Sequence, residues 1–288
     1  MTVGGIYFSM PGNEAMASAL AKRSHGNLGV LEHRRFPDAE SYVRLASDVR
    51  GMDVTIVCTL ARPDPQFLPL VFAADAARDC GAASVALVAP YLAYMRQDAR
   101  FSEGEAMSSA SFARRLSRSF DRIVTIDPHL HRHRSLDDLF DIPVHVAHAA
   151  PLLANWIAQN VNDPLIIGPD RESEQWIAAV ANQVGAPHVV ANKNRRGDRL
   201  VETSLPDLVQ FAERSPVLVD DIVSSGRTMI EAARLLAAQG FAKPYCVIVH
   251  PIFSGNAFAE MLDAAQCIVS CDTISHVSNG IEVVSLLG

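Results

Sequence analysis

Short runs of valine, isoleucine and leucine alternate with helical patterns along this 288-residue chain, and the alternation constrains its fold more than any other feature. Several runs are apolar without interruption, as is typical of strands buried on both faces of a parallel sheet. The expected strands are 5–9, 54–60, 84–89, 122–126, 165–168, 187–190, 217–220, 245–250 and 268–270. The expected helices are 14–24, 66–80, 108–119, 151–159, 172–184 and 228–239. The alternation predicts parallel sheets with crossover helices.

The two halves of the chain repeat one pattern. Residues 54–90 follow the order strand, polar loop, helix, glycine, strand and proline, and residues 217–251 follow the same order. Gly185 and Gly240 come directly after two of the expected helices and suit left-handed C-caps. We therefore expect an α/β protein of two similar domains, residues 1–146 and residues 147–288, each a mainly parallel sheet flanked by helices.

Composition argues against several classes of function. The formal net charge is −7, whereas a general nucleic-acid surface requires a basic face. The five cysteines form no Cys-x-x-Cys pair, which favours buried thiols over disulfides or a zinc site. The N-terminus does not have the pattern of a signal peptide, and the longest apolar stretch, around residues 82–93, is too short to span a bilayer. These features predict a cytoplasmic protein with no nucleic-acid or membrane partner.

Residues 217–228, Val-Leu-Val-Asp-Asp-Ile-Val-Ser-Ser-Gly-Arg-Thr, carry the strongest chemical signal. A buried strand is expected to end in the carboxylates of Asp220 and Asp221, and a loop of small and hydroxylated residues leads into a helix. Backbone N–H groups at a helix start bind phosphate, and glycine lets the backbone approach the anion. The carboxylates would repel a phosphate, so they are placed to accept hydrogen bonds from vicinal hydroxyls or to lie near a divalent cation. The pattern indicates a sugar-phosphate site, and a solvated strand-to-helix turn is the alternative.

This string resembles the phosphoribosyl-pyrophosphate motif that phosphoribosyltransferases share with ribose-phosphate pyrophosphokinases. The rest of the chain, from about Phe36 to Thr273, resembles the pyrophosphokinases, and residues 104–109 and 192–199 resemble the shorter archaeal-type enzymes. The resemblance implies two phosphoribosyltransferase-like domains, the first binding ATP and the second ribose 5-phosphate. It also implies transfer of the β,γ-diphosphoryl group of ATP to the 1-hydroxyl of ribose 5-phosphate, with AMP as the second product. The implied ribose 5-phosphate contacts are Asp220, Asp221, Ser224, Ser225, Gly226, Arg227 and Thr228.

Two further segments resemble the family's nucleotide-binding blocks. Residues 35–40 are similar to a flexible loop that receives the adenine of ATP, partly across a subunit boundary, so the resemblance implies a homo-oligomer, either a dimer or a hexamer. Residues 90–98 follow an expected strand and include Arg96, whose planar, permanently charged guanidinium suits a polyphosphate. The implied ATP contacts are Phe36, Asp38, Glu40, Arg96, Gln97, Asp98 and His129.

The resemblance implies two ligands for Mg²⁺, His129 and Asp170. Magnesium takes few protein oxygens when substrate phosphates complete its coordination shell. His131 and His133 alternate with His129, but no cysteine or Glu-x-x-His pattern accompanies them, so a zinc site is not favoured. Directly after Asp170 the family usually has a glycine pair, and this chain has 171–172, Arg-Glu, instead. That departure bears on the backbone contact with ribose C1 or pyrophosphate.

Residues 192–199, Asn-Lys-Asn-Arg-Arg-Gly-Asp-Arg, resemble the family's catalytic loop. Lys193 and Arg195 fall on its catalytic lysine and arginine. Two cations that close over the β-phosphate can stabilise the charge that develops on phosphoryl oxygens during transfer. The alternative is a basic hairpin tip without a catalytic role.

Two other functions stay open at this stage. A phosphoribosyltransferase would explain residues 217–228 but not the nucleotide segments or the catalytic loop. A non-catalytic regulatory homologue that binds phosphoribosyl pyrophosphate would accommodate the substitutions at 171–172. The retained Lys193, Arg195, His129 and Asp170 oppose that second alternative.

Overall fold

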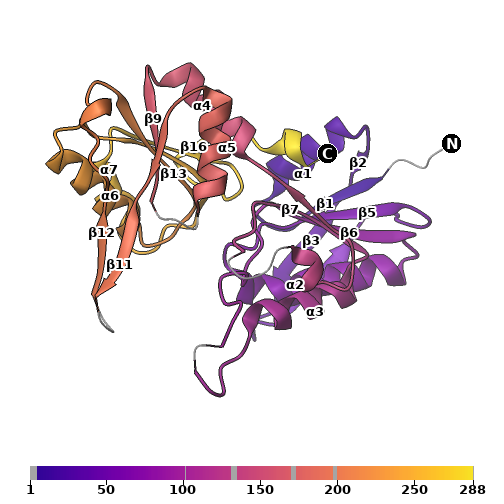
Figure 1. Cartoon of the computed structure of the whole chain (residues 1–288). Coiled ribbons are helices and arrows are strands. Elements are labelled where there is room, and N and C mark those ends of the chain that lie inside the picture. Colours follow the sequence, from indigo (N-terminus) through magenta and orange to yellow (C-terminus); the bar gives the residue numbers. More distant parts are fainter. Residues whose placement is uncertain (1–4, 101, 131–134, 170–172, 197–199, 288) are drawn as a thin grey trace. The chain divides into compact units, whose positions relative to one another are not determined.

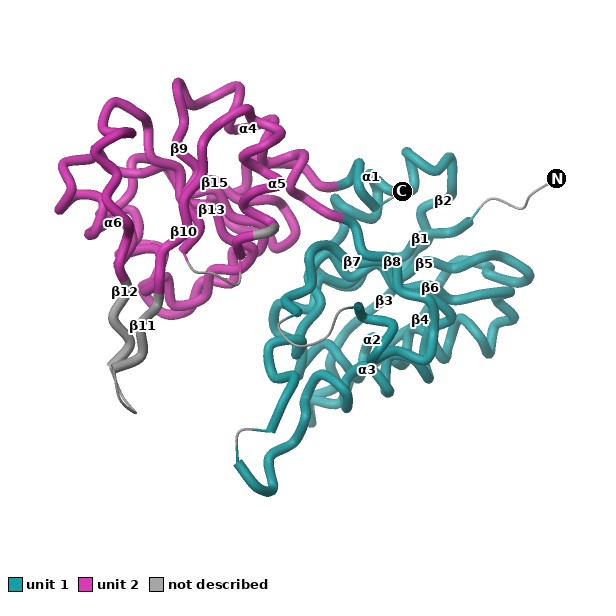
Figure 2. The backbone as a smooth tube through the Cα atoms, viewed as in Figure 1, with its two compact units in different colours: residues 1–147, 284–288 teal, residues 148–283 magenta. Residues whose placement is uncertain are grey.

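The computed structural model describes residues 5–287 except 101, 131–134, 170–172 and 197–199, and the chain divides into two compact units. Unit 1 comprises residues 1–147 and 284–288, and unit 2 comprises residues 148–283 (Figure 2). The sequence placed the division at 146 and assigned the last residues to the second domain. In the structure the 3-10 turn η4 (Val284–Leu286) instead contacts α1 (Glu14–Arg23) of unit 1.

Unit 1 is built on a six-stranded parallel sheet in the order β2-β1-β5-β6-β7-β8 (Figure 1). Its strands are β1 (Ile6–Ser9), β2 (Asn27–Leu28), β5 (Asp53–Val57), β6 (Ser84–Ala89), β7 (Arg122–Ile126) and β8 (Val144–Ala147). Helices α1, α2 (Pro63–Asp79) and α3 (Ser108–Ser119) lie in the connections. A separate antiparallel hairpin, β3 (Leu31–Arg35) and β4 (Ser41–Leu45), contacts α2 through β4.

Unit 2 repeats this plan with a six-stranded parallel sheet in the order β10-β9-β13-β14-β15-β16. Its strands are β9 (Pro164–Gly168), β10 (His188–Val190), β13 (Ser215–Val223), β14 (Tyr245–Pro251), β15 (Cys267–Cys271) and β16 (Asn279–Ile281). Its helices are α4 (Ala150–Asn160), α5 (Glu174–Val184), α6 (Arg227–Ala238) and α7 (Ala257–Ala264). The antiparallel hairpin β11 (Asn192–Arg196) and β12 (Leu200–Ser204) follows β10, as β3 and β4 follow β2.

The strand registers align the two units residue by residue. Arg122 pairs with Ala86 at the start of β7, and Cys267 pairs with Tyr245 at the start of β15. The internal likeness seen between residues 54–90 and 217–251 is therefore a shared β-α-β unit, β5-α2-β6 and β13-α6-β14. The expected α/β fold of two similar parallel-sheet domains is confirmed.

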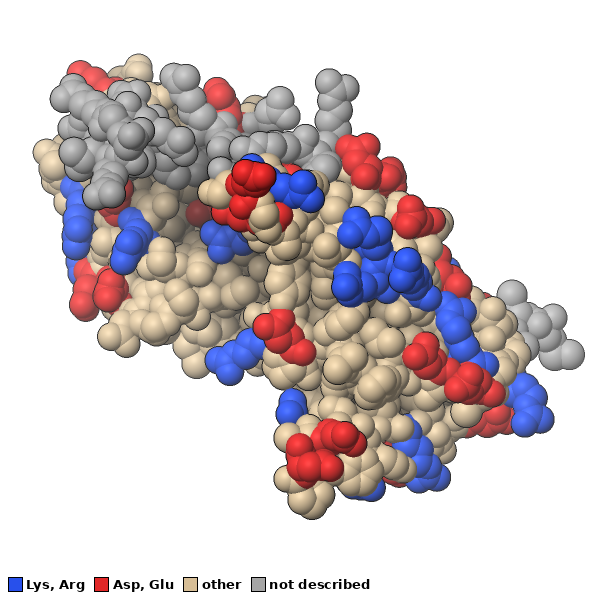
Figure 3. All heavy atoms as spheres, turned by 90° about the horizontal axis from the view of Figure 1, so that it is seen from below, with Lys and Arg blue, Asp and Glu red and all other residues tan. Residues whose placement is uncertain are grey.

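Apolar strands account for the core of each unit. The central strands β5, β6, β13 and β14 are buried over most of their length, which agrees with their predominantly apolar sequence. Gly185 takes a φ of 74° as the left-handed C-cap of α5, as expected. No helix in the described part of the chain is long and apolar enough to cross a membrane. Basic and acidic side chains are interspersed on the face of the molecule in Figure 3.

Candidate active site

The carboxylates of Asp220 and Asp221 lie within β13 rather than just beyond it. The sequence predicted a strand that ends at 220, but β13 continues to Val223 because Ile222 and Val223 are buried and pair with His250 and Pro251 of β14. Both carboxylate residues are half-buried, and the backbone N–H of Asp221 donates to Oδ1 of Asp220 at 3.0 Å. The extension of the strand fixes the backbone of both carboxylates before the loop begins.

Gly226 forms the start of α6 in a left-handed conformation, with a φ of 68°. A Cβ at this position would lie 2.9 Å from Sδ of Met261, a buried residue of α7. Because the N-cap is a glycine, the N-cap residue has no side chain that could accept a hydrogen bond from the first turn of α6. Backbone N–H groups at such a helix start are available for an anion, which supports the phosphate-binding prediction for residues 224–228.

A second contact holds the loop from the side of α7. The backbone N–H of Ser254 donates to the carbonyl oxygen of Ser224 at 3.0 Å. Ser224 and Thr228 are half-buried, whereas Ser225 and Arg227 are exposed. The loop therefore has a fixed inner side and an exposed outer side, as a surface site for a sugar phosphate requires.

The next two strand ends of unit 2 are joined by a buried histidine and threonine. His250 Nδ1 lies 3.0 Å from Oγ1 of Thr273, and that hydroxyl donates to the carbonyl oxygen of Val249 at 2.8 Å. Because the single hydroxyl hydrogen of Thr273 is used in this way, His250 Nδ1 is the donor in their hydrogen bond. These residues fix the ends of β14 and β15, and the sequence had assigned neither of them a catalytic role.

In unit 1, the segment 90–98 follows β6 and the segment 127–129 follows the neighbouring strand β7. Arg96 is exposed, Gln97 is half-buried and Asp98 is 5% exposed. Because the carboxyl ends of adjacent parallel strands meet at one sheet edge, this segment and His129 share that edge. Asp127 has a positive φ of 33° and donates its N–H to the carbonyl oxygen of Ala147. A non-glycine residue in that conformation marks a constrained turn next to His129.

The predicted adenine-binding residues lie at the tip of the hairpin β3–β4. The Phe36 N–H donates to the carbonyl oxygen of Glu40 at 2.8 Å, and the Glu40 N–H donates to Asp38 Oδ1 at 3.2 Å. The Phe36 ring is 39% exposed, and the guanidinium of Arg34 lies 4.6 Å from its centre. The tip is thus organised by contacts within its own hairpin, on a sheet separate from β6 and β7, which precede Arg96 and His129.

Lys193 and Arg195 lie on β11, where the sequence led us to expect a loop. The backbone of Lys193 pairs with Thr203 and that of Arg195 pairs with Val201 on β12. The polar and basic sequence of 192–196 has no apolar pattern typical of a strand, and the pairing with β12 holds it in the strand conformation. Residues 170–172, which include Asp170, lie outside the described part of the chain, as do residues 197–199 and the histidines at 131 and 133.

Among the described residues, no group of three or more histidine, cysteine, aspartate or glutamate side chains is arranged to hold a metal ion. Mg²⁺ is commonly bound by one or two protein groups together with substrate phosphates. Each unit by itself contains donor groups of this kind, His129 in unit 1 and the carboxylates of Asp220 and Asp221 in unit 2.

The fold and the loop on β13 define a protein made of two phosphoribosyltransferase-type units. The family model described as the phosphoribosyl transferase domain matches residues 135–286. The model described as the N-terminal domain of ribose phosphate pyrophosphokinase matches residues 6–119.

Named relatives then specify the family. The ribose-phosphate pyrophosphokinase of Methanopyrus kandleri is 34% identical over 261 residues, covering 89% of this chain and 88% of the relative. That of Methanosarcina acetivorans is 32% identical over 279 residues, covering 96% and 95%. The crystal structure of phosphoribosylpyrophosphate synthetase from Mycobacterium smegmatis has a TM-score of 0.83 at 23% identity and covers 94% of this chain and 89% of that one. The chain belongs to the ribose-phosphate pyrophosphokinase family, and it is a transferase that makes phosphoribosyl pyrophosphate.

Proposed function

We propose that this enzyme transfers the β,γ-diphosphoryl group of ATP to the 1-hydroxyl of ribose 5-phosphate and releases phosphoribosyl pyrophosphate and AMP. The observation that carries the proposal is the β13–α6 connection, which has two fixed carboxylates at one end and a glycine-capped helix start at the other. The helix start and the side chains of residues 224–228 bind the 5-phosphate. Asp220 and Asp221 accept hydrogen bonds from the ribose hydroxyls, which orients C1 toward the donor.

The reaction is a substitution at the β-phosphorus of ATP. The O1 oxygen of ribose 5-phosphate forms a bond to that phosphorus, and the bond between the β-phosphorus and the bridging oxygen to the α-phosphorus breaks. The electron pair of the broken bond stays on AMP, and the O1 proton passes to solvent. Lys193 and Arg195 stabilise charge on the transferring phosphoryl oxygens, so positioning and charge stabilisation supply most of the rate.

The donor nucleotide is assigned to unit 1. Arg96 binds the polyphosphate, and Gln97, Asp98 and His129 surround it at the same sheet edge. His129 and Asp170 are the residues that would hold Mg²⁺, which neutralises phosphate charge when bound.

The Phe36 hairpin is proposed to serve the nucleotide of a second copy, so that the enzyme works as a homo-oligomer. Within the part of the chain that the structure describes, five of the eight exposed large apolar side chains lie in unit 1: Leu28, Val30, Phe36, Leu68 and Phe72. Coexpression of Phe36→Ala with Lys193→Ala tests the arrangement. If each site is shared between two copies, mixed oligomers regain activity, because some of their sites then contain both an intact Phe36 and an intact Lys193. Mixed oligomers with no more activity than either parent would contradict it.

The reaction itself is tested by incubating the purified protein with ATP, Mg²⁺ and ribose 5-phosphate and measuring AMP. AMP must form only when all three are present. Absence of AMP together with tight binding of phosphoribosyl pyrophosphate would favour a regulatory homologue. Turnover of phosphoribosyl pyrophosphate with a nucleobase would favour a phosphoribosyltransferase.

A further inference from the structure

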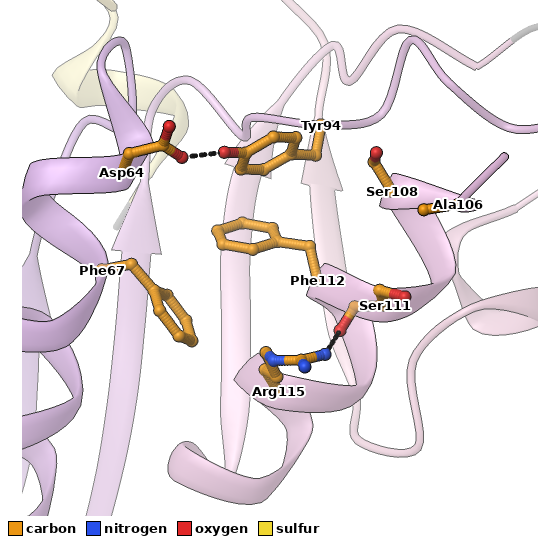
Figure 4. A pocket seen from close by; sticks show the side chains of 8 residues that line it. All are labelled: Asp64, Phe67, Tyr94, Ala106, Ser108, Ser111, Phe112 and Arg115. Atoms are coloured by element: carbon orange, nitrogen blue, oxygen red, sulfur yellow. Dashed lines mark hydrogen bonds between the residues drawn. The ribbon is translucent and has the colours of Figure 1, made fainter.

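A pocket of about 320 Å³ lies in unit 1 between α2, α3 and the segment that follows β6 (Figure 4). None of the residues assigned to ATP, ribose 5-phosphate or catalysis lines it. Its size is at the lower end of the range for small-molecule sites. The pocket is therefore a candidate for a separate ligand.

Three aromatic rings form the apolar wall of this pocket. Phe112 of α3 lies at its centre, with its ring 5.3 Å from that of Phe67 on α2 and 4.9 Å from that of Tyr94. The two pairs are tilted by 51° and 56°, so the rings present both faces and edges to the pocket (Figure 4). Such a wall suits a flat aromatic ligand better than an extended polar one.

The positively and negatively charged groups of the pocket lie on different sides of it. Ser108, Ser111 and Arg115 recur at helical spacing along one side of α3, and Arg115 Nη1 donates to the carbonyl oxygen of Ser111 at 3.0 Å. On the opposite side, Asp64 in the first turn of α2 accepts a hydrogen bond from the Tyr94 hydroxyl (Figure 4). One side of the pocket therefore offers donors and positive charge, and the other offers a carboxylate.

We propose that this pocket binds a neutral heteroaromatic ring of nucleobase size. Its N–H edge faces Asp64, its carbonyl or ring-nitrogen acceptors face Ser111 and Arg115, and its plane packs against the aromatic wall. A nucleobase has donors and acceptors on opposite edges of a flat ring, which is the arrangement that the pocket complements.

Two walls of the pocket are connected directly to the segment assigned to ATP. The Ser108 hydroxyl donates to Gln97 Oε1 at 2.7 Å, and the Ser109 N–H donates to the Gln97 carbonyl oxygen at 3.3 Å. Tyr94 lies two residues before Arg96 and takes a positive φ of 64°, an uncommon conformation for a bulky residue. A ligand that contacts Tyr94 and Ser108 thus stabilises the conformation of 94–98 seen here.

The effect on the reaction rests on the proposed function, whereas the binding does not. A ligand that stabilises this conformation of 94–98 favours ATP binding to it, and ATP must favour the ligand by the same factor, because coupling between sites is reciprocal. We expect a saturating ligand to lower the KM for ATP about threefold and to leave the KM for ribose 5-phosphate unchanged.

Calorimetric titration with hypoxanthine tests the binding. The full-length protein should bind it saturably with a dissociation constant at or below about 1 mM. Asp64→Asn and Arg115→Gln should each weaken binding about tenfold, because each removes a charge-assisted hydrogen bond. Phe36→Ala, on the nucleotide hairpin, should not weaken it. Loss of binding in Phe36→Ala but not in Asp64→Asn would overturn the site, and binding of benzoate but not hypoxanthine would overturn the ligand class.

Steady-state kinetics then test the coupling. A KM for ATP that is unchanged by saturating hypoxanthine would overturn the link to 94–98, and a raised KM would identify simple competition with ATP. If the protein forms no AMP at all, the proposed function fails while the calorimetric result still decides whether the pocket is a binding site.

Discussion

The two units have one scaffold but different chemistry at the same point of it. Val57 of unit 1 pairs with Val88 as Val219 of unit 2 pairs with Val247. The next two residues are Cys58 and Thr59 in unit 1, and they correspond to the carboxylates of Asp220 and Asp221 in unit 2. The buried half of the repeat is shared, whereas the residues at the sheet edge are not.

The helix that follows differs in the same way. In unit 1, residues 58–62 lead to α2, which begins with Pro63 and has Arg62 as N-cap at a φ of −130°. In unit 2, the corresponding stretch 220–226 is two residues longer and ends in left-handed Gly226. A proline start removes an N–H group from the helix end, and a glycine start leaves the N–H groups accessible. Loop length and cap residue, rather than the sheet, therefore distinguish unit 2, to which the proposed function assigns the sugar phosphate, from unit 1.

The largest effect is expected in the hairpins. Lys193→Ala on β11 should lower turnover at least about a hundredfold, because it removes a charge that stabilises the transition state by roughly 3 kcal/mol. Arg44→Ala on the corresponding hairpin of unit 1, where the side chain forms an exposed 2.9 Å ion pair with Glu32, should change turnover little. The measurement is the rate of AMP formation. Similar rates for both variants would remove the catalytic distinction between the hairpins.

The carboxylate pair gives the next largest effect. Asp221→Asn should raise the KM for ribose 5-phosphate about tenfold to a hundredfold, since a hydrogen bond to a charged group contributes about 1.5–3 kcal/mol. Thr59→Ser, at the equivalent position of unit 1, should leave that KM unchanged. Initial rates over a range of sugar-phosphate concentrations measure both. An equal rise in the two variants would show that the units share the acceptor site.

Gly226 allows a smaller but more specific test. Gly226→Ala should weaken ribose 5-phosphate binding about tenfold, because the left-handed backbone costs roughly 1–2 kcal/mol and the new methyl group meets Met261. Adding Met261→Ala should restore part of the lost affinity. Gly185→Ala has the same backbone strain but nothing within 4 Å of its Cβ, so it serves as the matched control. If the control weakens the sugar phosphate as much, general destabilisation rather than loop geometry is responsible.

The smallest expected effect is a pH dependence of stability that arises just before β7 in unit 1 and has no counterpart before β15 in unit 2. Burial raises the pKa of Asp121, but hydrogen bonds from the Val85 N–H and the Arg78 guanidinium outweigh it and leave that pKa below its usual value of 3.8. The contribution of Asp121 to stability is therefore present above pH 3.8 and is lost as the pH falls through the lowered pKa. In unit 2 the counterpart of Val85 is Pro244, which has no N–H to satisfy, and the counterpart of Asp121 is Gln266.

Denaturant titrations of Asp121→Asn measure this difference. The variant should be destabilised by no more than about 1 kcal/mol at pH 7, because the carboxylate is half exposed to solvent. The difference in free energy of unfolding between the variant and the unmutated protein should narrow toward pH 3. Gln266→Glu in unit 2 should not raise the free energy of unfolding by a similar amount. A gap that is independent of pH would rule out ionisation of Asp121 as its source.

The regular parts of the fold were predictable because their signal is local. Helix α3 and strands β6 and β7 have the predicted bounds, since apolar periodicity defines them. Helix α7 and the hairpin strands β3, β11 and β12 were not predicted. These hairpin strands form because each pairs with a neighbouring strand, and their own sequences have no apolar pattern that would indicate a strand.

The sequence proposed the residues of the candidate site but not the residues that support them. The sequence marked Gly226 and Ser224, yet Met261 on α7 and Ser254 in the loop before that helix hold them from more than 25 residues away. The resemblance to a family supplied the roles of Lys193, His129 and Asp170, which residue chemistry alone left open. Nothing in the sequence indicated that Tyr94 and Asp64 line one pocket, because 29 residues separate them along the chain.

The return of residues 284–288 to unit 1 has a consequence for the order in which the chain can fold. During synthesis the N-terminal unit normally folds first. Here the contact between η4 and α1 cannot form until all of unit 2 has been translated. The first unit to emerge is thus the last to be completed, and a chain that stops short of residue 284 would have an intact unit 2 and an unfinished unit 1.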